Sequence, residues 1–268
     1  MQSVTAIEVL VIGGGPAGQK AAIQAVKAGK KVALVEQDRT VGGGCVSRGT
    51  IPSKSLREAA LRAIEVEKSS TLFASEKRTG VELADLMSSV ESIVDAHAAY
   101  MGRQLERNGV RLVHGRARFV SPREVVVRSP TGSAQRFNAE LIVIATGSRP
   151  RSPPDVPVDH DHILDSDSIL SMHALPESLC VLGGGVIACE YASIFANLGV
   201  KVTLIDKAER PLAFMDPELV KKLAGALERC GGRVIGGQPV PKVEFDGVSH
   251  VVAKLASGEE IRAERMLV

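Results

Sequence analysis

The stretch VGGGCVSRGTIPSKSL, residues 41–56, contains three side chains that suit a redox or group-transfer site. Cys45 has a thiol, and the thiolate form of cysteine is a strong nucleophile. Thr50 has only a hydroxyl, so electrons cannot pass through Cys45 and Thr50 as they pass through two sulfurs. Lys54 brings a positive charge to the start of a helix predicted over 53–68. The chemistry of this stretch therefore depends on the elements around it.

The sequence around this stretch repeats itself at an offset of 170 residues. The segment VLVIGGGPAGQKAAIQAVKAGKKVALVE ends at Glu36, and LCVLGGGVIACEYASIFANLGVKVTLID ends at Asp206. Each copy predicts a buried strand, a glycine turn, a helix and a second strand that closes on an acid. Such a turn brings a pyrophosphate to a helix N-terminus, and the acid accepts hydrogen bonds from a ribose. Two copies predict two dinucleotide sites, with Gly13, Gly15, Gly18 and Glu36 matching Gly183, Gly185, Ala188 and Asp206.

The remaining elements complete an α/β fold of two Rossmann-like dinucleotide-binding domains, with parallel central sheets and an antiparallel meander. A proline-rich segment near residue 150 predicts a boundary between domains 1–150 and 151–268. Further helices are predicted over 82–108 and 216–232, the latter ending at glycines. Further strands are predicted over 110–120, 124–129, 139–150, 233–237, 241–247, 249–257 and 260–268, with a hairpin turn at 130–132.

The composition argues against several classes of function. The 268 residues carry a formal net charge of +2, 3% aromatic residues and no tryptophan, so neither a nucleic acid nor a membrane surface is an expected partner. No apolar run reaches the ~20 residues of a spanning helix, and the N-terminal apolar run leads directly into glycines, as a first strand would. We therefore expect a cytoplasmic chain without a signal peptide.

Cysteines and histidines show no ligand pattern. Cys45, Cys180, Cys189 and Cys230 are scattered without a CxxC pair, so we expect no metal and no disulfide framework. The six histidines bear no relation to one another or to Cys45. The sequence therefore points to no catalytic histidine.

Four motifs in order, VIGGGPAG, GGGCVSRGTIPSK, IATGSRP and GGGVIACEYASIFANLG, resemble the pyridine nucleotide:disulfide oxidoreductase family over essentially the whole chain. The resemblance implies that the first domain binds FAD and the second binds NAD(H) or NADP(H). The implied FAD-binding residues are Gly13, Gly15, Pro16, Ala17, Gly18, Glu36, Gly43, Gly44, Cys45, Thr50, Lys54, Ala145, Thr146 and Gly147. The implied nicotinamide-nucleotide residues are Gly183, Gly185, Val186, Ile187, Ala188, Glu190, Asp206, Lys207 and Arg210.

The resemblance also implies catalytic roles. Lys54 matches the lysine beside the flavin N5 side and Glu190 matches its acidic partner, a pair that would help neutralise charge as hydride arrives. Cys45 matches the first of two redox cysteines, whereas Thr50 stands at the second position, nearest the flavin. Disulfide reduction is therefore not expected. The loop is similar instead to that of soluble pyridine nucleotide transhydrogenases, which pass hydride between NADPH and NAD+ through FAD.

Several alternatives stay open on the sequence. Cys45 can be a relic that packs against its loop or a single reactive thiol, as in an NAD(P)H oxidase or diaphorase. A non-catalytic nucleotide-binding module is the third reading. Asp206 favours the free 2′-hydroxyl of NAD, whereas Lys207 and Arg210 suit the 2′-phosphate of NADP. Val186 stands where disulfide reductases often have a tyrosine over the nicotinamide.

The resemblance further implies a part of the protein that this sequence lacks. Family members continue with a return to the FAD domain and a dimer-interface domain. We therefore expect that the chain is truncated, that its FAD domain is incomplete, and that the full-length protein is a homodimer.

Overall fold

The computed structural model describes residues 4–72 and 82–268, with the side chains of residues 67–72 outside that description. The chain forms two compact units, Met1–Pro52 with Glu91–Arg149, and Ser53–Val90 with Pro150–Val268. Relative to the domains expected at 1–150 and 151–268, the segment Ser53–Val90 groups with the second unit. The assignment of one nucleotide to each domain stays a prediction.

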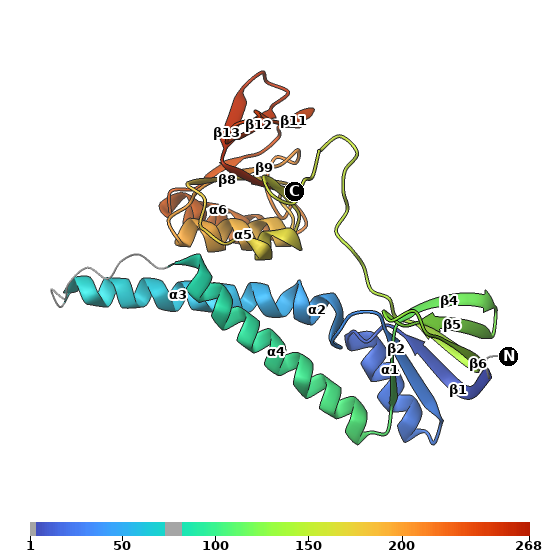
Figure 1. Ribbon diagram of the computed structural model, residues 1–268. Helices are drawn as coiled ribbons and strands as arrows, with labels where there is room; N and C mark the ends of the chain where they lie inside the picture. The colour runs from blue at the N-terminus through green and yellow to red at the C-terminus, as the bar shows by residue number, and fades with distance from the viewer. Residues whose placement is uncertain (1–3, 73–81) are drawn as a thin grey trace. The chain divides into compact units, whose positions relative to one another are not determined.

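The first unit is built on a six-stranded sheet in the order β3-β2-β1-β6-β5-β4 (Figure 1). The four strands from β3 to β6 in that order are parallel, and β6, β5 and β4 pair antiparallel. This arrangement places the carboxyl ends of β1, β2 and β6 at one edge, next to both glycine-rich segments. The strands are β1 (Val4–Ile12), β2 (Val32–Glu36), β3 (Arg111–His114), β4 (Arg116–Ser121), β5 (Glu124–Arg128) and β6 (Ala134–Ile144).

Both faces of this sheet are covered. Helix α1 (Pro16–Lys27) and the later turns of α4 (Leu83–Arg107) cover one face, where Val11, Leu34 and Leu105 form a buried cluster. The meander of β4 and β5 covers the other face through Val125, Val127 and neighbouring residues. Residues 9–12 of β1 and 32–35 of β2 are therefore buried on both faces of the sheet, as their continuous hydrophobic runs predicted.

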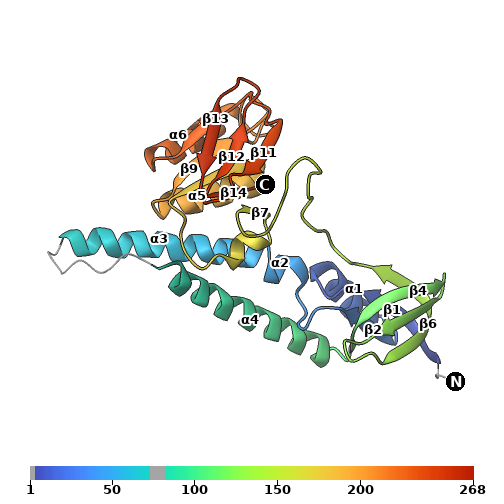
Figure 2. The ribbon, with the colours of Figure 1, turned by 45° about the horizontal axis from the view of Figure 1, so that its top comes forward.

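The second unit has a five-stranded parallel sheet in the order β10-β9-β8-β14-β7 and a separate antiparallel meander (Figure 2). The sheet strands are β7 (Ile163–Leu164), β8 (Ser178–Leu182), β9 (Lys201–Ile205), β10 (Arg233–Ile235) and β14 (Arg265–Leu267). The meander strands are β11 (Lys242–Phe245), β12 (Val251–Lys254) and β13 (Glu260–Ala263). The helices of this unit are α5 (Val186–Asn197), α6 (Pro217–Arg229) and the short 3-10 helix η1 (Ser168–Ser171), together with α3 (Thr50–Leu72) from Ser53 on and α4 as far as Val90.

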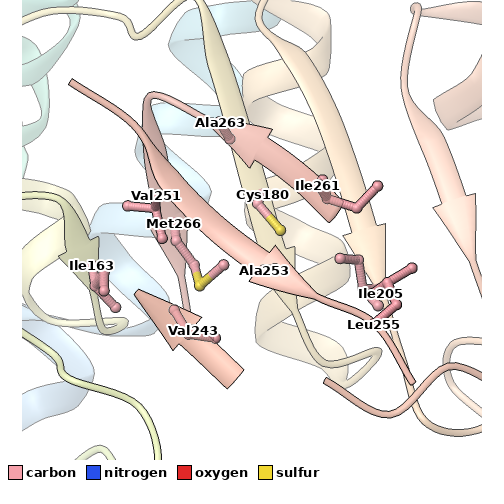
Figure 3. Packing of buried hydrophobic residues seen from close by; sticks show 10 residues of the cluster. All are labelled: Ile163, Cys180, Ile205, Val243, Val251, Ala253, Leu255, Ile261, Ala263 and Met266. Carbon is pink, nitrogen blue, oxygen red and sulfur yellow. The ribbon is translucent and has the colours of Figure 1, made fainter. Parts of the chain in front are cut away.

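The core of the second unit lies between the sheet and the meander. Cys180 of β8, Ile205 of β9 and Met266 of β14 pack against Val251 and Ala253 of β12 (Figure 3). Helices α5 and α6 pack on the opposite face of the sheet (Figure 1). The prediction of two α/β folds with parallel central sheets and an antiparallel meander is confirmed.

Several predicted elements have different limits in the structure. The strand predicted over 260–268 is two strands, because the chain leaves the meander after Ala263 and joins the parallel sheet at Arg265. The strand predicted over 110–120 divides at Gly115, whose φ of +153° brings the backbone against the Arg128 carbonyl. The strand predicted over 139–150 ends at Ile144.

The helices follow the sequence closely. Helix α3 (Thr50–Leu72) begins three residues before the predicted start, and α4 matches the predicted range within one residue at each end. Helix α6 begins where predicted because the Asp216 carboxylate accepts the amides of Glu218 and Leu219. The glycine loop contains the short helix α2 (Gly43–Ser47), which periodicity did not predict. None of the described helices is long and apolar enough to cross a membrane.

Candidate functional site

The first glycine turn joins β1, α1 and β6 through backbone contacts. Gly13 has a φ of +107°, and a Cβ on it would lie 2.2 Å from the Ala145 carbonyl oxygen. A Cβ on Gly18 would lie 1.9 Å from the Gly13 carbonyl oxygen. Both positions therefore require glycine, which lets the helix start close to the end of the strand. Thr146 and Gly147 follow Ala145 beyond the strand and are exposed.

The start of α1 has the features of an anion site. Gly15 is the N-cap, Pro16 is the first helical residue, and no side chain among the described residues caps the amides. Ala17 lies in the same first turn. Gly43 approaches closely, since a Cβ on it would lie 3.0 Å from the Gly15 Cα. A helix end with uncapped amides and a glycine backbone on both sides fits a pyrophosphate.

Glu36 lies beside this turn at the end of β2. The residue is only 5% exposed, and its Oε2 accepts the Gly14 amide at 2.7 Å. Its Oε1 accepts the Asp38 amide at 2.9 Å. The carboxylate is therefore held at a fixed distance from the turn and keeps acceptor capacity for the hydroxyls of a ribose.

The second unit repeats this arrangement with more space. Gly183 has a φ of +111°, and Gly185 is the N-cap of α5. A Cβ on Gly185 would meet no described atom within 4 Å. Asp206 follows β9, and a Cβ on Gly184 would lie 2.1 Å from its Oδ2. Ala188 is half-buried in the first turn of α5, and Val186 and Ile187 are exposed beside it.

The two cations predicted near Asp206 have different surroundings. Lys207 is exposed. Arg210 uses its guanidinium to donate to two backbone carbonyls, those of Ala213 at 2.9 Å and Met215 at 3.0 Å. Arg210 therefore stabilises the loop after Asp206 in this structure. Its guanidinium, for which a contact with a 2′-phosphate was predicted, donates to protein carbonyls here.

The chemistry-bearing stretch lies at α2 and the start of α3. Cys45 is exposed within α2, Gly44 precedes it, and Thr50 is the exposed first residue of α3. Lys54, one turn into α3, pairs with Glu190 of α5. The Glu190 side chain is 16% exposed, whereas that of Lys54 is 59% exposed. The structure thus brings together the two residues that the family resemblance assigned to one catalytic pair.

Sequence reasoning missed three buried polar groups on the two glycine-turn helices. The Gln19 amide donates to the Gly14 carbonyl at 2.7 Å, and the Cys189 thiol lies 3.7 Å from the Gly184 carbonyl. The Tyr191 hydroxyl is buried without a hydrogen-bond partner among the described residues. Burial, with a smaller effect of Glu190, raises the pKa of Tyr191, so this hydroxyl stays protonated. The 170-residue repeat aligns Gln19 with Cys189, and this alignment is the feature of the sequence that could have identified these two residues.

The described residues give no sign of a metal or disulfide centre. No group of three or more histidine, cysteine or acidic side chains is placed to hold a metal ion among them. The four cysteines are all free thiols, two exposed and two buried.

The model of the pyridine nucleotide-disulphide oxidoreductase family matches residues 7–268. The chain belongs to this family. It is 38% identical over 260 residues to a soluble pyridine nucleotide transhydrogenase of Colwellia psychrerythraea and 40% identical over 262 residues to one of Mycobacterium bovis. Each alignment covers 97% of this chain and 56% of the relative, so the chain spans about half the length of these curated relatives.

Solved structures of other proteins have the same fold. The flavoprotein disulfide reductase RclA of Escherichia coli, in a Cu(II) complex, superposes with a TM-score of 0.85 at 26% identity, covering 98% of this chain and 56% of that one. LpdA of Mycobacterium tuberculosis superposes with a TM-score of 0.86 at 24% identity, covering 98% of this chain and 58% of that one. These likenesses confirm the fold of two α/β units with parallel central sheets that the motifs implied.

Proposed function

We propose that this chain is the two-nucleotide part of an FAD-dependent oxidoreductase that transfers hydride between NADPH and NAD+. The observation that carries the proposal is Thr50, at the start of α3 where a disulfide reductase needs its second sulfur. A hydroxyl cannot accept electrons as a disulfide does. Electrons from a bound flavin would then leave as hydride to a second nicotinamide. The names of the curated relatives support this activity.

The first unit would hold FAD. Uncapped amides at Gly15, the close backbone of Gly43 and the fixed Glu36 carboxylate suit a dinucleotide. When bound, FAD supplies the two-electron carrier of the reaction. The residues of the chain would bind and orient it. Ala145 is the first residue past β6, and its backbone packs against Gly13, so this residue would lie at the entrance to the FAD site.

The pair of Lys54 and Glu190 would set the charge at the reaction centre. Glu190 is largely buried and holds the Lys54 ammonium, which would otherwise move freely on its four-carbon stem. A fixed ammonium stabilises negative charge that develops during hydride arrival. The pair therefore acts on the transfer step, and its exposed lysine leaves room for a ligand beside it.

The second unit would bind the nicotinamide nucleotides in turn. Asp206 at the end of β9 suits a ribose with free hydroxyls, and the space at Gly185 admits a pyrophosphate. Lys207 is the exposed cation beside Asp206 and is the proposed contact for the 2′-phosphate of NADP(H). Arg210 would add to this contact only by releasing the Ala213 and Met215 carbonyls.

Hydride exchange between NADPH and a thionicotinamide analogue of NAD+ tests this proposal. We expect exchange by the purified flavin-loaded protein, the same rate within about twofold in Cys45→Ser, and a loss of about tenfold or more in Lys54→Met, which removes the fixed charge. Flavin content measured on the same samples separates lost binding from lost transfer. A flavin-loaded protein that shows no exchange would contradict the proposal.

A second candidate rests on the exposure of Cys45 in α2. A single accessible thiol beside the flavin loop suits an NAD(P)H oxidase or diaphorase that passes electrons to oxygen or a quinone. In that case Cys45→Ser would abolish electron transfer to the quinone. A protein that binds nucleotides but never flavin would instead be a non-catalytic module.

A further inference from the structure

The carbonyl of the middle glycine in the first turn accepts two hydrogen bonds. The Gly42 amide donates to the Gly14 carbonyl at 2.9 Å, which ties the loop after Glu36 to the turn. The Gln19 side chain donates to the same oxygen at 2.7 Å from the first turns of α1. Gln19 is 6% exposed, so this bond is protected from water. The turn, the helix and the loop therefore meet at the Gly14 carbonyl oxygen, and we call this arrangement the junction.

The second turn repeats this junction at the same offset of 170 residues. The Leu212 amide donates to the Gly184 carbonyl at 2.7 Å, as Gly42 does to Gly14. Cys189, which is 9% exposed, occupies the position that matches Gln19, and its thiol lies 3.7 Å from the same oxygen. The repeat therefore extends beyond Asp206 to the loop at Leu212.

Backbone geometry shows that the second loop is held under strain. Leu212 has a φ of +47°, a region that residues other than glycine rarely adopt, whereas Gly42 has a φ of +130°. A strained conformation persists only where surrounding contacts hold it. The bond of Leu212 to Gly184 and the Arg210 bonds to the Ala213 and Met215 carbonyls supply those contacts.

The junction also sets the position of the acid. A Cβ on Gly14 would lie 2.8 Å from Glu36 Oε2, and a Cβ on Gly184 would lie 2.1 Å from Asp206 Oδ2. The acid thus lies directly on the middle glycine in each unit. A shift of Gly184 would move the surface against which Asp206 rests.

We propose that Cys189 is a positioning residue of the second nucleotide site, a role that rests on the proposed function. Its thiol donates to the Gly184 carbonyl and so holds the turn and the Leu212 loop in the arrangement that fixes Asp206 for the ribose. Cys189 stays a donor at neutral pH because burial, with a smaller effect of Asp206, raises the pKa of its thiol to about 11. A thiol is a weaker donor than the amide of Gln19, so the second junction is held less firmly than the first.

Three variants test the proposal. Cys189→Ala removes the donor, Cys189→Ser keeps a donor of similar size, and Cys180→Ala removes a buried thiol from β8, on the other side of the sheet from α5. Hydrogen–deuterium exchange without nucleotide measures the amides of residues 208–215. Calorimetry with ADP-ribose measures affinity at the second site.

In Cys189→Ala we expect amide exchange over 208–215 to quicken by roughly two- to fivefold and the Kd for ADP-ribose to rise by a similar factor. Cys189→Ser should restore both values to within about twofold of the parent protein. Cys180→Ala should lower the melting temperature and leave both values unchanged. Equal behaviour of Cys189→Ala and the parent, or equal effects of Cys189→Ala and Cys180→Ala, would overturn the proposal.

The two readouts separate this proposal from the proposed function. If the parent protein binds no ADP-ribose, the proposed function fails at the second unit. Exchange that quickens in Cys189→Ala alone would then still support the junction at Gly184, and unchanged exchange would overturn it.

Discussion

Replacing Gly18 by alanine gives the sharpest test of the first glycine turn. The added Cβ would lie 1.9 Å from the Gly13 carbonyl oxygen, whereas real Cβ atoms essentially never come closer than 3.0 Å. The helix and the turn would have to separate by about 1.1 Å. Both groups are backbone, so no side chain can turn away, and the cost lies at the upper end of the ~1–3 kcal/mol range for overpacking. Alanine is up to about 1 kcal/mol more favourable than glycine in a helix, so we expect the free energy of unfolding to fall by about 2 kcal/mol.

Urea unfolding followed by circular dichroism, with flavin content measured on the same samples, checks this prediction. Gly44→Ala is the matched control for stability alone, because Gly44 is itself an implied FAD-binding residue; it is helical, and a Cβ on it would meet no described atom within 4 Å. We expect Gly18→Ala to lose stability and flavin, and Gly44→Ala to stay within about 0.5 kcal/mol of the parent. If Gly18→Ala keeps both its stability and its flavin, the close packing of α1 on Gly13 is not what specifies glycine there.

Three further predictions follow from the second unit. Gly185→Ala should keep stability within about 1 kcal/mol, because its φ of −74° suits alanine, and should raise the Kd for ADP-ribose by about tenfold or more in calorimetry. Tyr191→Phe should stabilise the protein by about 1 kcal/mol in urea unfolding, since it removes a buried hydroxyl without a partner among the described residues; destabilisation would mean that the hydroxyl is bonded. Burial raises the pKa of Cys180 to about 12 and, with a smaller effect of Asp206, that of Cys189 to about 11, both from 9.0. The unfolded chain therefore loses these protons first, so unfolding free energy should fall as pH rises above 9, and by less in Cys180→Ala.

The sequence predicted the parts of the site that depend on local geometry. The acid follows the first glycine of the turn by 23 residues, with the helix between them, so residue types and spacing were sufficient to place Gly13, Gly15 and Glu36 at one end of the sheet. The pairing of Lys54 with Glu190 came from the family resemblance alone, because 136 residues separate them. No spacing rule could have brought these two side chains together.

Other features of the site and fold depend on contacts made only in the folded chain. The place of Arg210 after Asp206 left a 2′-phosphate contact or an ordinary surface charge open. In the structure its guanidinium donates to carbonyls of its own loop, and the phosphate contact stays a prediction. The strand at 260–268 was predicted as one continuous strand. Its division at Glu264 follows from pairing with two different sheets, where the Glu264 amide donates to the Ser178 hydroxyl. Which strands pair with one another depends on the packing of the whole chain and cannot be predicted from the strand propensity of individual residues.

Differences between the two copies are as informative as their likeness. In the first copy Gly43 lies against Gly15, and Gly18 leaves no room between α1 and the turn. In the second copy Ala188 fits where Gly18 stood, and a Cβ on Gly185 would meet no described atom within 4 Å. Backbone therefore packs closely around the first turn, whereas the second turn is more open. Under the proposed assignment, the closed turn suits a flavin that stays through every turnover, and the open turn suits nicotinamide nucleotides that enter and leave.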